Sequence, residues 1–342
     1  MMLGRRAALA LPALFLARPA LIRPARAAGE TLRLGLLHTL SPAPFYLAQE
    51  SGFWTGQGLE VEFRFFEAAQ PIAAAAVAGD IDLGVTALTG GFFALAGKGA
   101  LKVIGGAMHE EKGYPMTAFL VSRKAFEAGL DDIAKMPGHS FGLTQFGSSF
   151  HYMMGRLAQA RGFELKSVTL RALQSIGNML AALRTGQVDA TMAIASMARP
   201  LIESGEAKLL GWVGDEVPYQ ITALFAPGRS LTGRAEALRR FCAGYRQGVA
   251  QYREAFLHLG ADGKPVYGPA TGPAVAAIGR YVYPGDPAAE AKIKEGVGWY
   301  DRDGALDVAD VRAQLAWFTG QGLVKGAIDP DSVIDTGFLP SR

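Results

Sequence analysis

The segment LRLGLLHTLSPAPFYLAQESGFWTGQGLEVEFRFF, residues 32–66, decides the fold class, because a strand, a helix and a second strand follow one another in it. Leucines occupy every second position from 32 to 36, and apolar residues alternate with charged ones from Leu59 to Phe65. Such period-two patterns predict β-strands. Ser41 and Pro42 suit the start of a helix, and Gly52 suits its end. The segment therefore predicts a β-α-β unit, the building block of a parallel sheet.

The same alternation continues along the chain and predicts two groups of strands and helices. The first group adds a helix near 69–78, which ends at Gly79, and strands near 81–85 and 101–106. The second group begins after residues 119–122 and comprises the segments 141–144, 148–161, 168–171, 176–184 and 190–195. Strands that alternate with short helices form mostly parallel sheets covered on both faces. The pattern predicts an α/β protein with two lobes.

A short internal repeat links the two groups. The repeat is found in AVAGDIDLGVTA (76–87) and LRTGQVDATMAI (183–194). In each, the end of a predicted helix is followed by Gly, any residue, Ile or Val, and Asp, and then by a predicted strand; the two glycines are Gly79 and Gly186. The simplest cause of this match is two lobes of similar topology. Asp80, Asp82 and Asp189 are expected to serve turns and caps.

The N-terminal segment predicts export. Residues 1–6 are basic, residues 7–17 form an unbroken apolar stretch, and Ala25-Arg26-Ala27 is an A-x-A site, so residues 1–27 are interpreted as a cleavable signal peptide. The apolar stretch is well short of the roughly 20 residues that span a bilayer. Arg5-Arg6 is interpreted as an ordinary basic flank, and export by the twin-arginine route stays open.

Outside residues 1–27 the charge is nearly balanced, with 29 basic and 31 acidic residues. This balance lacks the excess of basic residues typical of proteins that bind nucleic acid or anionic membranes. The one cysteine, Cys242, lies in a helical pattern far from the cleavage site, so it offers neither a disulfide nor a lipid anchor. These features predict a periplasmic, monomeric protein without membrane insertion and without a nucleic-acid partner.

Three predicted helix starts follow predicted strands and form a candidate site. They lie at Ser41, at Thr89-Gly90-Gly91, and at Gly147-Ser148-Ser149. A helix that begins at the carboxyl end of a parallel strand points its free amides, and the positive end of its dipole, into the crevice where open α/β sheets bind ligands. The three starts therefore predict a site for a small anionic or polar group.

The sequence also resembles a known family. APFYLAQESGFWTGQGLEVEFRFF (43–66), AAAVAGDIDLGV (74–85) and LRTGQVDA (183–190) are similar to the substrate-binding proteins of ABC importers in the nitrate, sulfonate, taurine and thiamine-precursor group. The resemblance extends from about residue 31 to residue 226. It implies a type II periplasmic binding fold, with two α/β lobes, mostly parallel sheets, two crossover segments and a ligand in the cleft.

The resemblance also implies how the chain is divided. Residues 28–120 and 225–342 are expected to form lobe 1, and residues 121–224 lobe 2. The helical C-terminal part is expected to pack on lobe 1. The crossover segments are predicted near 119–122 and 222–226, because no long polar linker separates the two groups of elements.

The resemblance assigns ligand contacts to the predicted helix starts and to AIASMARP, residues 193–200. The assigned residues are Ser41, Phe45, Thr89, Gly90, Gly91, Ser148, Ser149 and Ser196. The aromatic residues beside these starts are expected either to enclose an apolar ligand body or to pack between sheet and helix; they are Phe45, Phe92, Phe146 and Phe150. His38 and His109 are candidates to donate to an anionic group, with a structural role as the alternative.

The function implied by the resemblance is capture of a small organic ligand, an anionic sulfonate or carboxylate with or without an aromatic body, for delivery to the membrane permease of an ABC importer. An enzyme on the same fold, desulfinase-like or thiamine-precursor-synthase-like, is an alternative, and so is a ligand-sensing receptor. The sequence contains no cysteine-rich iron motif and no metal-ligand spacing of histidines, and Cys242 lies on a packed helix. No catalytic residue, metal site or cofactor is therefore predicted.

Overall fold

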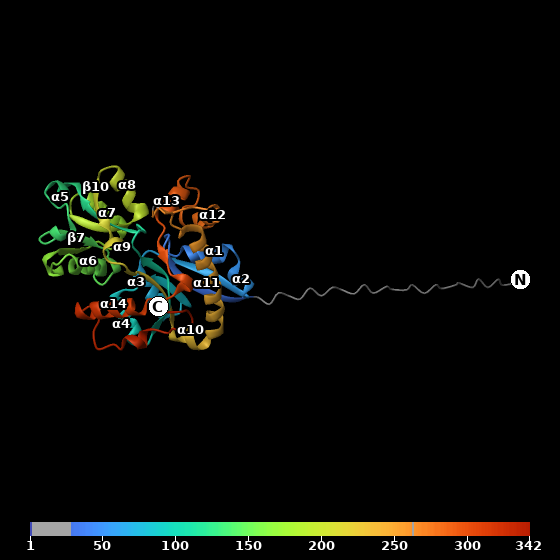
Figure 1. The fold of residues 1–342 in the computed structure, drawn as a ribbon. Coiled ribbons are helices and arrows are strands. Elements are labelled where there is room, and N and C mark those ends of the chain that lie inside the picture. Colours follow the sequence, from blue (N-terminus) through green and yellow to red (C-terminus); the bar gives the residue numbers. More distant parts are fainter. Residues whose placement is uncertain (2–28, 262) are drawn as a thin grey trace.

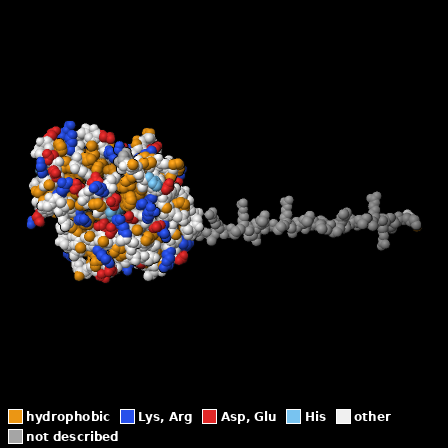
Figure 2. All heavy atoms as spheres, in the orientation of Figure 1, with side chains coloured by type: hydrophobic (Ala, Val, Ile, Leu, Met, Phe, Trp, Pro, Cys, Tyr) orange, Lys and Arg blue, Asp and Glu red, His pale blue; other side chains and the backbone are white. Residues whose placement is uncertain are grey.

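The computed structural model describes Met1, residues 29–261 and residues 263–342, and it has two lobes, each built around a five-stranded sheet (Figure 1). The predicted signal peptide, apart from Met1, lies outside the described residues. None of the described helices combines the length and the apolar character that a membrane span needs. Basic and acidic side chains are interspersed over the face shown in Figure 2, as the balanced charge predicts.

The first sheet has the strand order β2-β1-β3-β12-β4. Four strands run in one direction, β1 (Glu30–Leu37), β2 (Leu59–Phe66), β3 (Leu83–Ala87) and β4 (Leu101–Gly106), and β12 (Thr222–Pro227) runs against them. The helices of this lobe's N-terminal part are α1 (Ala43–Glu50), α2 (Phe53–Gly56), α3 (Ala69–Ala78) and α4 (Gly90–Ala96). The alternating leucines of β1 are fully buried, as their spacing predicts.

The second sheet has the order β10-β6-β9-β7-β8. Its strands are β6 (Thr117–Ser122), β7 (Ser140–Leu143), β8 (Thr169–Ala172), β9 (Ala190–Ile194) and β10 (Ala207–Trp212), and β6 runs against the other four. Its helices are α5 (Arg123–Glu127), α6 (Ser149–Ala160), α7 (Ile176–Arg184), α8 (Ala195–Glu203) and α9 (Val213–Glu216). This lobe is the green and yellow part at the upper left of Figure 1.

In each sheet the antiparallel strand is the one that arrives from the other lobe. The chain leaves the first sheet after β4 and enters the second at β6, and it returns to the first sheet at β12. A small sheet, β11-β5-β13, includes a strand from both connections, β5 (Met108–Glu110) and β11 (Tyr219–Gln220), and adds β13 (Trp299–Tyr300). The proposed lobe boundaries, 120/121 and 224/225, fall inside β6 and β12 and stay predictions.

The internal repeat corresponds to equivalent places in the two sheets. In the first sheet Leu34 pairs with Leu83, and in the second sheet Phe141 pairs with Ala190. Phe141 follows Leu34, and Ala190 follows Leu83, by the same interval that separates the two repeat glycines. The two lobes therefore share one strand arrangement, in which the repeat forms the helix end and the central parallel strand.

The C-terminal part is mainly helical. It comprises α10 (Gly228–Gly233), α11 (Ala235–Phe256), α12 (Thr271–Val282), α13 (Ala289–Glu295) and α14 (Val308–Gly320). Short 3₁₀ turns occur at Ile133–Lys135, Leu165–Ser167, Arg302–Gly304 and Pro330–Val333. Helix α11 packs against α1 and α2 of the first lobe, where the Trp54 indole donates to the Phe241 carbonyl at 2.9 Å. Burial raises the pKa of the Cys242 thiol on α11 to about 12.

Candidate ligand-binding cavity

A cavity of about 140 Å³ lies between the two lobes. Its lining comes from both sheets and from the small sheet that joins them, with Ala87 at the end of β3, Ile194 at the end of β9 and Met108 in β5. The volume is close to the roughly 150 Å³ of an engineered apolar protein cavity that accepts benzene. The enclosed space therefore suits a small molecule with a body of about that size.

Six helix starts border this cavity, because each of these helices begins just after the carboxyl end of a strand. The lining residues at or next to the starts are Ser41 (α1), Ala69 (α3), Thr89 (α4), Ser148 (α6), Ser175 (α7) and Ala195 (α8). The first amides of a helix have no partner inside the helix, and the aligned peptide dipoles place partial positive charge at that end. These helix ends therefore give the cavity a positive potential that does not depend on cationic side chains.

Three of the six starts are capped by their own side chains. The hydroxyl of Thr89 accepts from the amide of Phe92 at 3.1 Å, that of Ser148 accepts from the amide of His151 at 3.4 Å, and that of Ser175 accepts from the amide of Asn178 at 3.1 Å. Helices α1, α3 and α8 have no such side-chain cap. At α3 the amides of Ala69 and Gln70 are candidates to donate to a ligand, since Pro71 has none. At α8 the Ala195 amide donates to the Met116 carbonyl at 2.7 Å, so the candidate donor is the next amide, that of Ser196.

The charged groups around the cavity are few. Among its described lining residues there is no Lys, Arg or His, and the one carboxylate, Glu67, belongs to an exposed side chain. Leu37, Leu40, Met116 and other apolar side chains form much of the remaining wall. An anionic ligand group would thus be held by amides and hydroxyls, and the rest of the ligand would contact apolar carbon.

Six of the thirteen residues predicted from the sequence line this cavity: Ser41, Thr89, Ser148, Ser149, Phe150 and Ser196. Gly90 and Gly91 lie next to it, but Gly90 faces Gly147 of the other lobe and Gly91 faces Gln70. The other five are two phenylalanines of the core, one exposed phenylalanine and two histidines.

Two of the predicted phenylalanines belong to the core. The ring of Phe45 is fully buried and stacks on Tyr245 of α11, with 4.2 Å between the ring centroids. The ring of Phe92 is also buried and packs against Phe93 and Phe225. In α1 all residues from Ala43 to Ala48 are buried, and in α4 both Phe92 and Phe93 are buried. The structure therefore assigns both residues to packing.

The other three residues lie outside the cavity lining. Phe146 is 54% exposed and contacts the edge of His151, and His38 is exposed and contacts the ring of Phe65. His109 is buried in β5, where its ring faces the start of α14. The loop that follows β4 is thus part of the small joining sheet, which turns the His109 ring away from the cleft.

Several lining residues were not predicted. Thr39, Thr144, Gln145, Ser175, Ile221 and Thr222 all line the cavity. Ser175 had a usable signal, because it stands immediately before the helical pattern at 176–184 and resembles the caps at Thr89 and Ser148. Ile221 and Thr222 lie at the predicted crossover segment near 222–226, but their place beside β5 depends on contacts between distant segments, such as the hydrogen bond from the Met108 amide to the Thr222 hydroxyl at 2.8 Å.

His151 supports the loop that carries two of the lining serines. Its ring nitrogen Nδ1 accepts a hydrogen bond from the amide of Gly147 at 3.1 Å. Burial lowers the pKa of His151 to about 4, so the ring is neutral at pH 7 and can act as an acceptor. The left-handed backbone of Gly147, with φ of 81°, completes the turn into α6.

The two lobes touch one another beside the cavity. The amide of Gly90 donates to the carbonyl of Gly147 at 2.9 Å, and the side-chain amide of Gln145 donates to that of Gln70. On another part of the interface Arg199 of α8 lies 3.3 Å from the carboxylate of Glu295 in α13. The two lobes are therefore in direct contact beside the cavity, and Tyr152 of α6 also packs against Trp317 and Phe318 of α14.

Each of the two sheets contains one antiparallel strand, which arrives from the other lobe, and a cavity lies between the lobes. This arrangement defines a periplasmic-binding-protein fold. A family model described as "NMT1/THI5 like" matches residues 40–254, and the chain belongs to this family. The family agrees with the resemblance found in the sequence. None of the curated proteins compared with the chain matches it.

Solved structures confirm the fold. The alkanesulfonate-binding protein SsuA from Xanthomonas axonopodis pv. citri, bound to MOPS, has a TM-score of 0.68 and 19% identity, over 91% of this chain and 100% of that one. The periplasmic aliphatic sulphonate binding protein SsuA from Escherichia coli has a TM-score of 0.68 and 18% identity, over 90% and 92%. The periplasmic nitrate-binding protein NrtA from Synechocystis PCC 6803 has a TM-score of 0.64 and 13% identity, over 90% and 86%.

Proposed function

We propose that this protein is a periplasmic solute-binding protein, which captures a small organic ligand between its lobes and delivers it to the permease of an ABC importer. The observation that carries the proposal is the cavity, because residues of both lobes line it and the interlobe contacts lie beside it. A ligand in that position binds the closed form better than the open form, so it shifts the equilibrium toward closure. The two SsuA structures and NrtA, which are binding proteins by their descriptions, support the same function.

The ligand is proposed to have an anionic head, a sulfonate or a carboxylate, and an apolar body. The head would accept hydrogen bonds from the uncapped starts of α3 and α8 and from hydroxyls such as Ser149 and Ser196. The body would lie against Leu40, Met116 and Phe150. Hydrogen bonds to a charged group contribute about 1.5–3 kcal/mol each and each buried CH₂ about 0.8 kcal/mol. A few such hydrogen bonds and a few buried CH₂ groups together supply the roughly 8 kcal/mol of micromolar binding, once the loss of ligand and side-chain freedom has been subtracted.

The geometry favours binding over catalysis. Ser148 and His151 are neighbours, but the Ser148 hydroxyl accepts from the His151 amide and the His151 ring accepts from the Gly147 amide. The histidine is therefore not positioned to activate the serine hydroxyl as a base. Cys242 is buried in α11, away from the residues that line the cavity. An enzyme of the same fold and a receptor for a signalling partner are the alternatives that a ligand screen separates.

The proposal is tested with a thermal-shift screen of the purified protein against alkyl and aryl sulfonates, aromatic carboxylates, pyrimidines and nitrate. A true ligand raises the melting temperature, because it binds the native state and not the unfolded chain. Each hit is then titrated by calorimetry, and the solution is analysed for chemical change of the ligand. Stoichiometric binding without turnover supports the proposal, and turnover of a hit would replace it with the enzyme alternative.

A further inference from the structure

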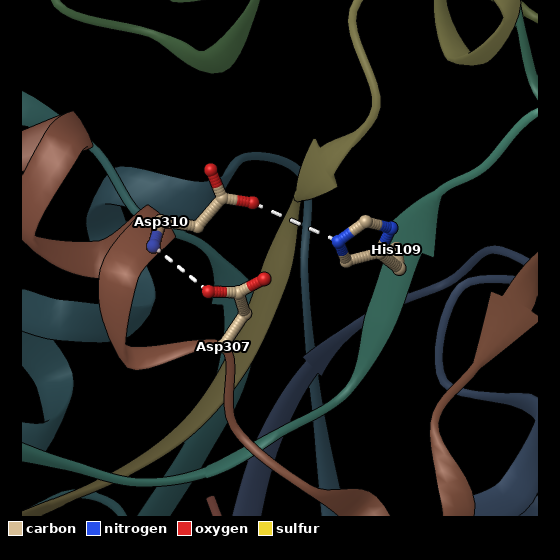
Figure 3. Close-up of side chains that lie close together, drawn as sticks. All are labelled: His109, Asp307 and Asp310. Carbon is tan, nitrogen blue, oxygen red and sulfur yellow. Dashed lines mark hydrogen bonds and ion pairs between the residues drawn. The ribbon is translucent and has the colours of Figure 1, made fainter. Parts of the chain in front are cut away.

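A second cluster of polar side chains lies outside the cavity, at the small sheet that joins the lobes. His109 comes from β5, and Asp307 and Asp310 come from the start of α14, much later in the chain. Figure 3 shows the three side chains converging on one point between the two elements. Their ligand atoms, one ring nitrogen and two carboxylate oxygens, all lie within 4.8 Å of one another. This set of donors has no role in the proposed ligand site.

The Nε2 atom of His109 faces the cluster. The residue is only 3% exposed, and its Nε2 atom lies 2.8 Å from the guanidinium of Arg342 and 3.6 Å from the Asp310 carboxylate. Because a guanidinium can only donate, Nε2 must be the acceptor and carries the lone pair. The proton is then on Nδ1, which lies 3.3 Å from the Glu111 carboxylate but makes no hydrogen bond to it. Metal-binding histidines usually donate this second N–H to a carboxylate, and Glu111 is close enough for that bond to form when an ion is bound.

The two carboxylates are held in place by backbone amides. Asp307 accepts from the amide of Asp310 at 2.9 Å, which caps α14, and Asp310 accepts from the amide of Gln220 at 2.6 Å. Both side chains are largely buried. Each carboxylate keeps further lone pairs, since an ionised carboxylate can accept about four hydrogen bonds in all. The donors are thus ordered before any ion arrives.

The local charge favours a cation. Arg342 lies 3.3 Å from Asp301 and 3.2 Å from Asp307, while Asp310 and Glu111 flank His109. Four carboxylates therefore lie beside Arg342 or His109, and Arg253 is a further guanidinium near Asp301. The Arg342 side chain is 41% exposed, so it can move toward solvent without disturbing the core.

We propose that His109, Asp307 and Asp310 form a binding site for a first-row divalent cation such as Zn²⁺, and that the Arg342 guanidinium competes with the metal for the same donors. One nitrogen and two carboxylate oxygens are a ligand set that Zn²⁺ accepts, with water completing the coordination. Zinc bonds of about 2.0–2.2 Å require the side chains to approach one another by roughly 1 Å. Bound metal would join α14 to β5, the strand that leads from one lobe to the other.

The test is calorimetric titration of Zn²⁺ into purified protein freed of metal with a chelator. One ion per chain is expected. His109→Gln and Asp310→Asn should each weaken binding at least tenfold, and Arg342→Ala should strengthen it several-fold, because the competing cation is removed. His139→Gln is the matched control, since His139 lies 3.5 Å from Asp189 but belongs to no group of three donors among the described residues. That variant should bind zinc as the wild type does.

A second measurement covers the case in which a variant at the buried His109 fails to fold. Asp307→Asn keeps an oxygen that can cap α14 but loses the carboxylate charge, so it should fold and still bind zinc at least tenfold more weakly. Co²⁺ gives an independent readout, because its visible spectrum changes when a histidine ligand binds. Absence of stoichiometric binding in both the wild type and Arg342→Ala would overturn the proposal. So would undiminished binding in Asp307→Asn and Asp310→Asn.

Discussion

The carboxylate of Asp82 accepts a hydrogen bond from the backbone amide of Arg33 at 2.8 Å, and this bond ties the middle of β1 to the start of β3. The second lobe contains the same bond, from the amide of Ser140 to Asp189, also at 2.8 Å. Donor and acceptor are 49 residues apart in both cases. Asp189 follows Asp82 by the same number of residues that separates Gly79 from Gly186. The aspartates of the sequence repeat therefore join equivalent strands in each lobe.

Replacing Asp82 should destabilise the first lobe. The Arg33 side chain also donates to Asp82, at 3.1 and 3.2 Å, so Asp82→Asn loses charged hydrogen bonds worth about 2 kcal/mol in all. Urea denaturation followed by circular dichroism measures the loss in the free energy of unfolding. Asp80→Asn, two residues away and exposed, is the control and should change this free energy little. An equal loss in both variants would contradict the assigned role.

The same carboxylate predicts an acid limb of stability. Burial alone would raise the pKa of Asp82, but the hydrogen bonds and charge of Arg33 outweigh it and hold the pKa below its ordinary value. The stabilisation is therefore present above about pH 4, the ordinary pKa of an aspartate, and is lost as the pH falls through the lower folded value. The difference in unfolding free energy between the wild type and Asp82→Asn should shrink over that range.

The two serines at the start of α6 should differ in their effects. Ser148 caps the helix, so Ser148→Ala should cost about 1 kcal/mol of stability as well as ligand affinity. Ser149 lines the cavity without capping, so Ser149→Ala should weaken ligand binding several-fold and leave the melting temperature nearly unchanged. Ser122→Ala removes the cap of α5 away from the cavity and is the control: stability falls, affinity does not. Thermal unfolding and calorimetry with a screened ligand separate these outcomes.

Removing the hydrogen bond between the side chains of Gln145 and Gln70, which joins the two lobes, should favour the open form. Gln70→Ala deletes a hydrogen bond that exists only when the lobes meet, and Gln70, unlike Gln145, does not line the cavity. The bound ligand should then dissociate several-fold faster, because the closed state loses a contact and the open state does not. Stopped-flow measurement of ligand release tests this, with the exposed Gln321→Ala as the control. Unchanged release in Gln70→Ala would show that this hydrogen bond does not hold the lobes together.

His151 predicts a second pH dependence, at higher pH than that of Asp82. Its pKa is about 4 in the folded protein and about 6.5 in an unfolded chain. The unfolded chain therefore binds more protons between these values, and the free energy of unfolding falls as the pH is lowered from about 6.5 to about 4. The loss should be on the order of 2 kcal/mol. Denaturation at several pH values should show a shallower slope in His151→Gln, and an unchanged slope would contradict the assignment.

Much of the fold was predictable because local patterns determine it. The alternating leucines of β1 and the G-x-[IV]-D repeat each depend on a few neighbouring residues, and each is found in the expected place. The first helix is also present, but it begins at Ala43 with Pro42 at its N-cap, and Ser41 does not cap it. The helix starts that line the cavity were predictable for the same reason, since Thr89 and Ser148 precede helical patterns.

The rest depended on distant partners. Phe45 was assigned to the site because it follows a helix start, but the face of α1 that carries it packs on α11, and the sequence does not show which face is covered. Strands β11 and β13 have two residues each, too few for a periodic pattern. The cluster at His109 required knowing that the start of α14 lies beside β5, a contact between segments far apart in the sequence.

The hydrogen bond between Gly90 and Gly147 involves main-chain atoms only. Substitutions among the side chains that line the cavity can therefore alter which guest is accepted without removing this point of attachment between the halves. A binding protein of the proposed kind can diverge in selectivity while keeping this backbone contact, and redesign for a new compound can begin from the lining residues with both glycines left unchanged.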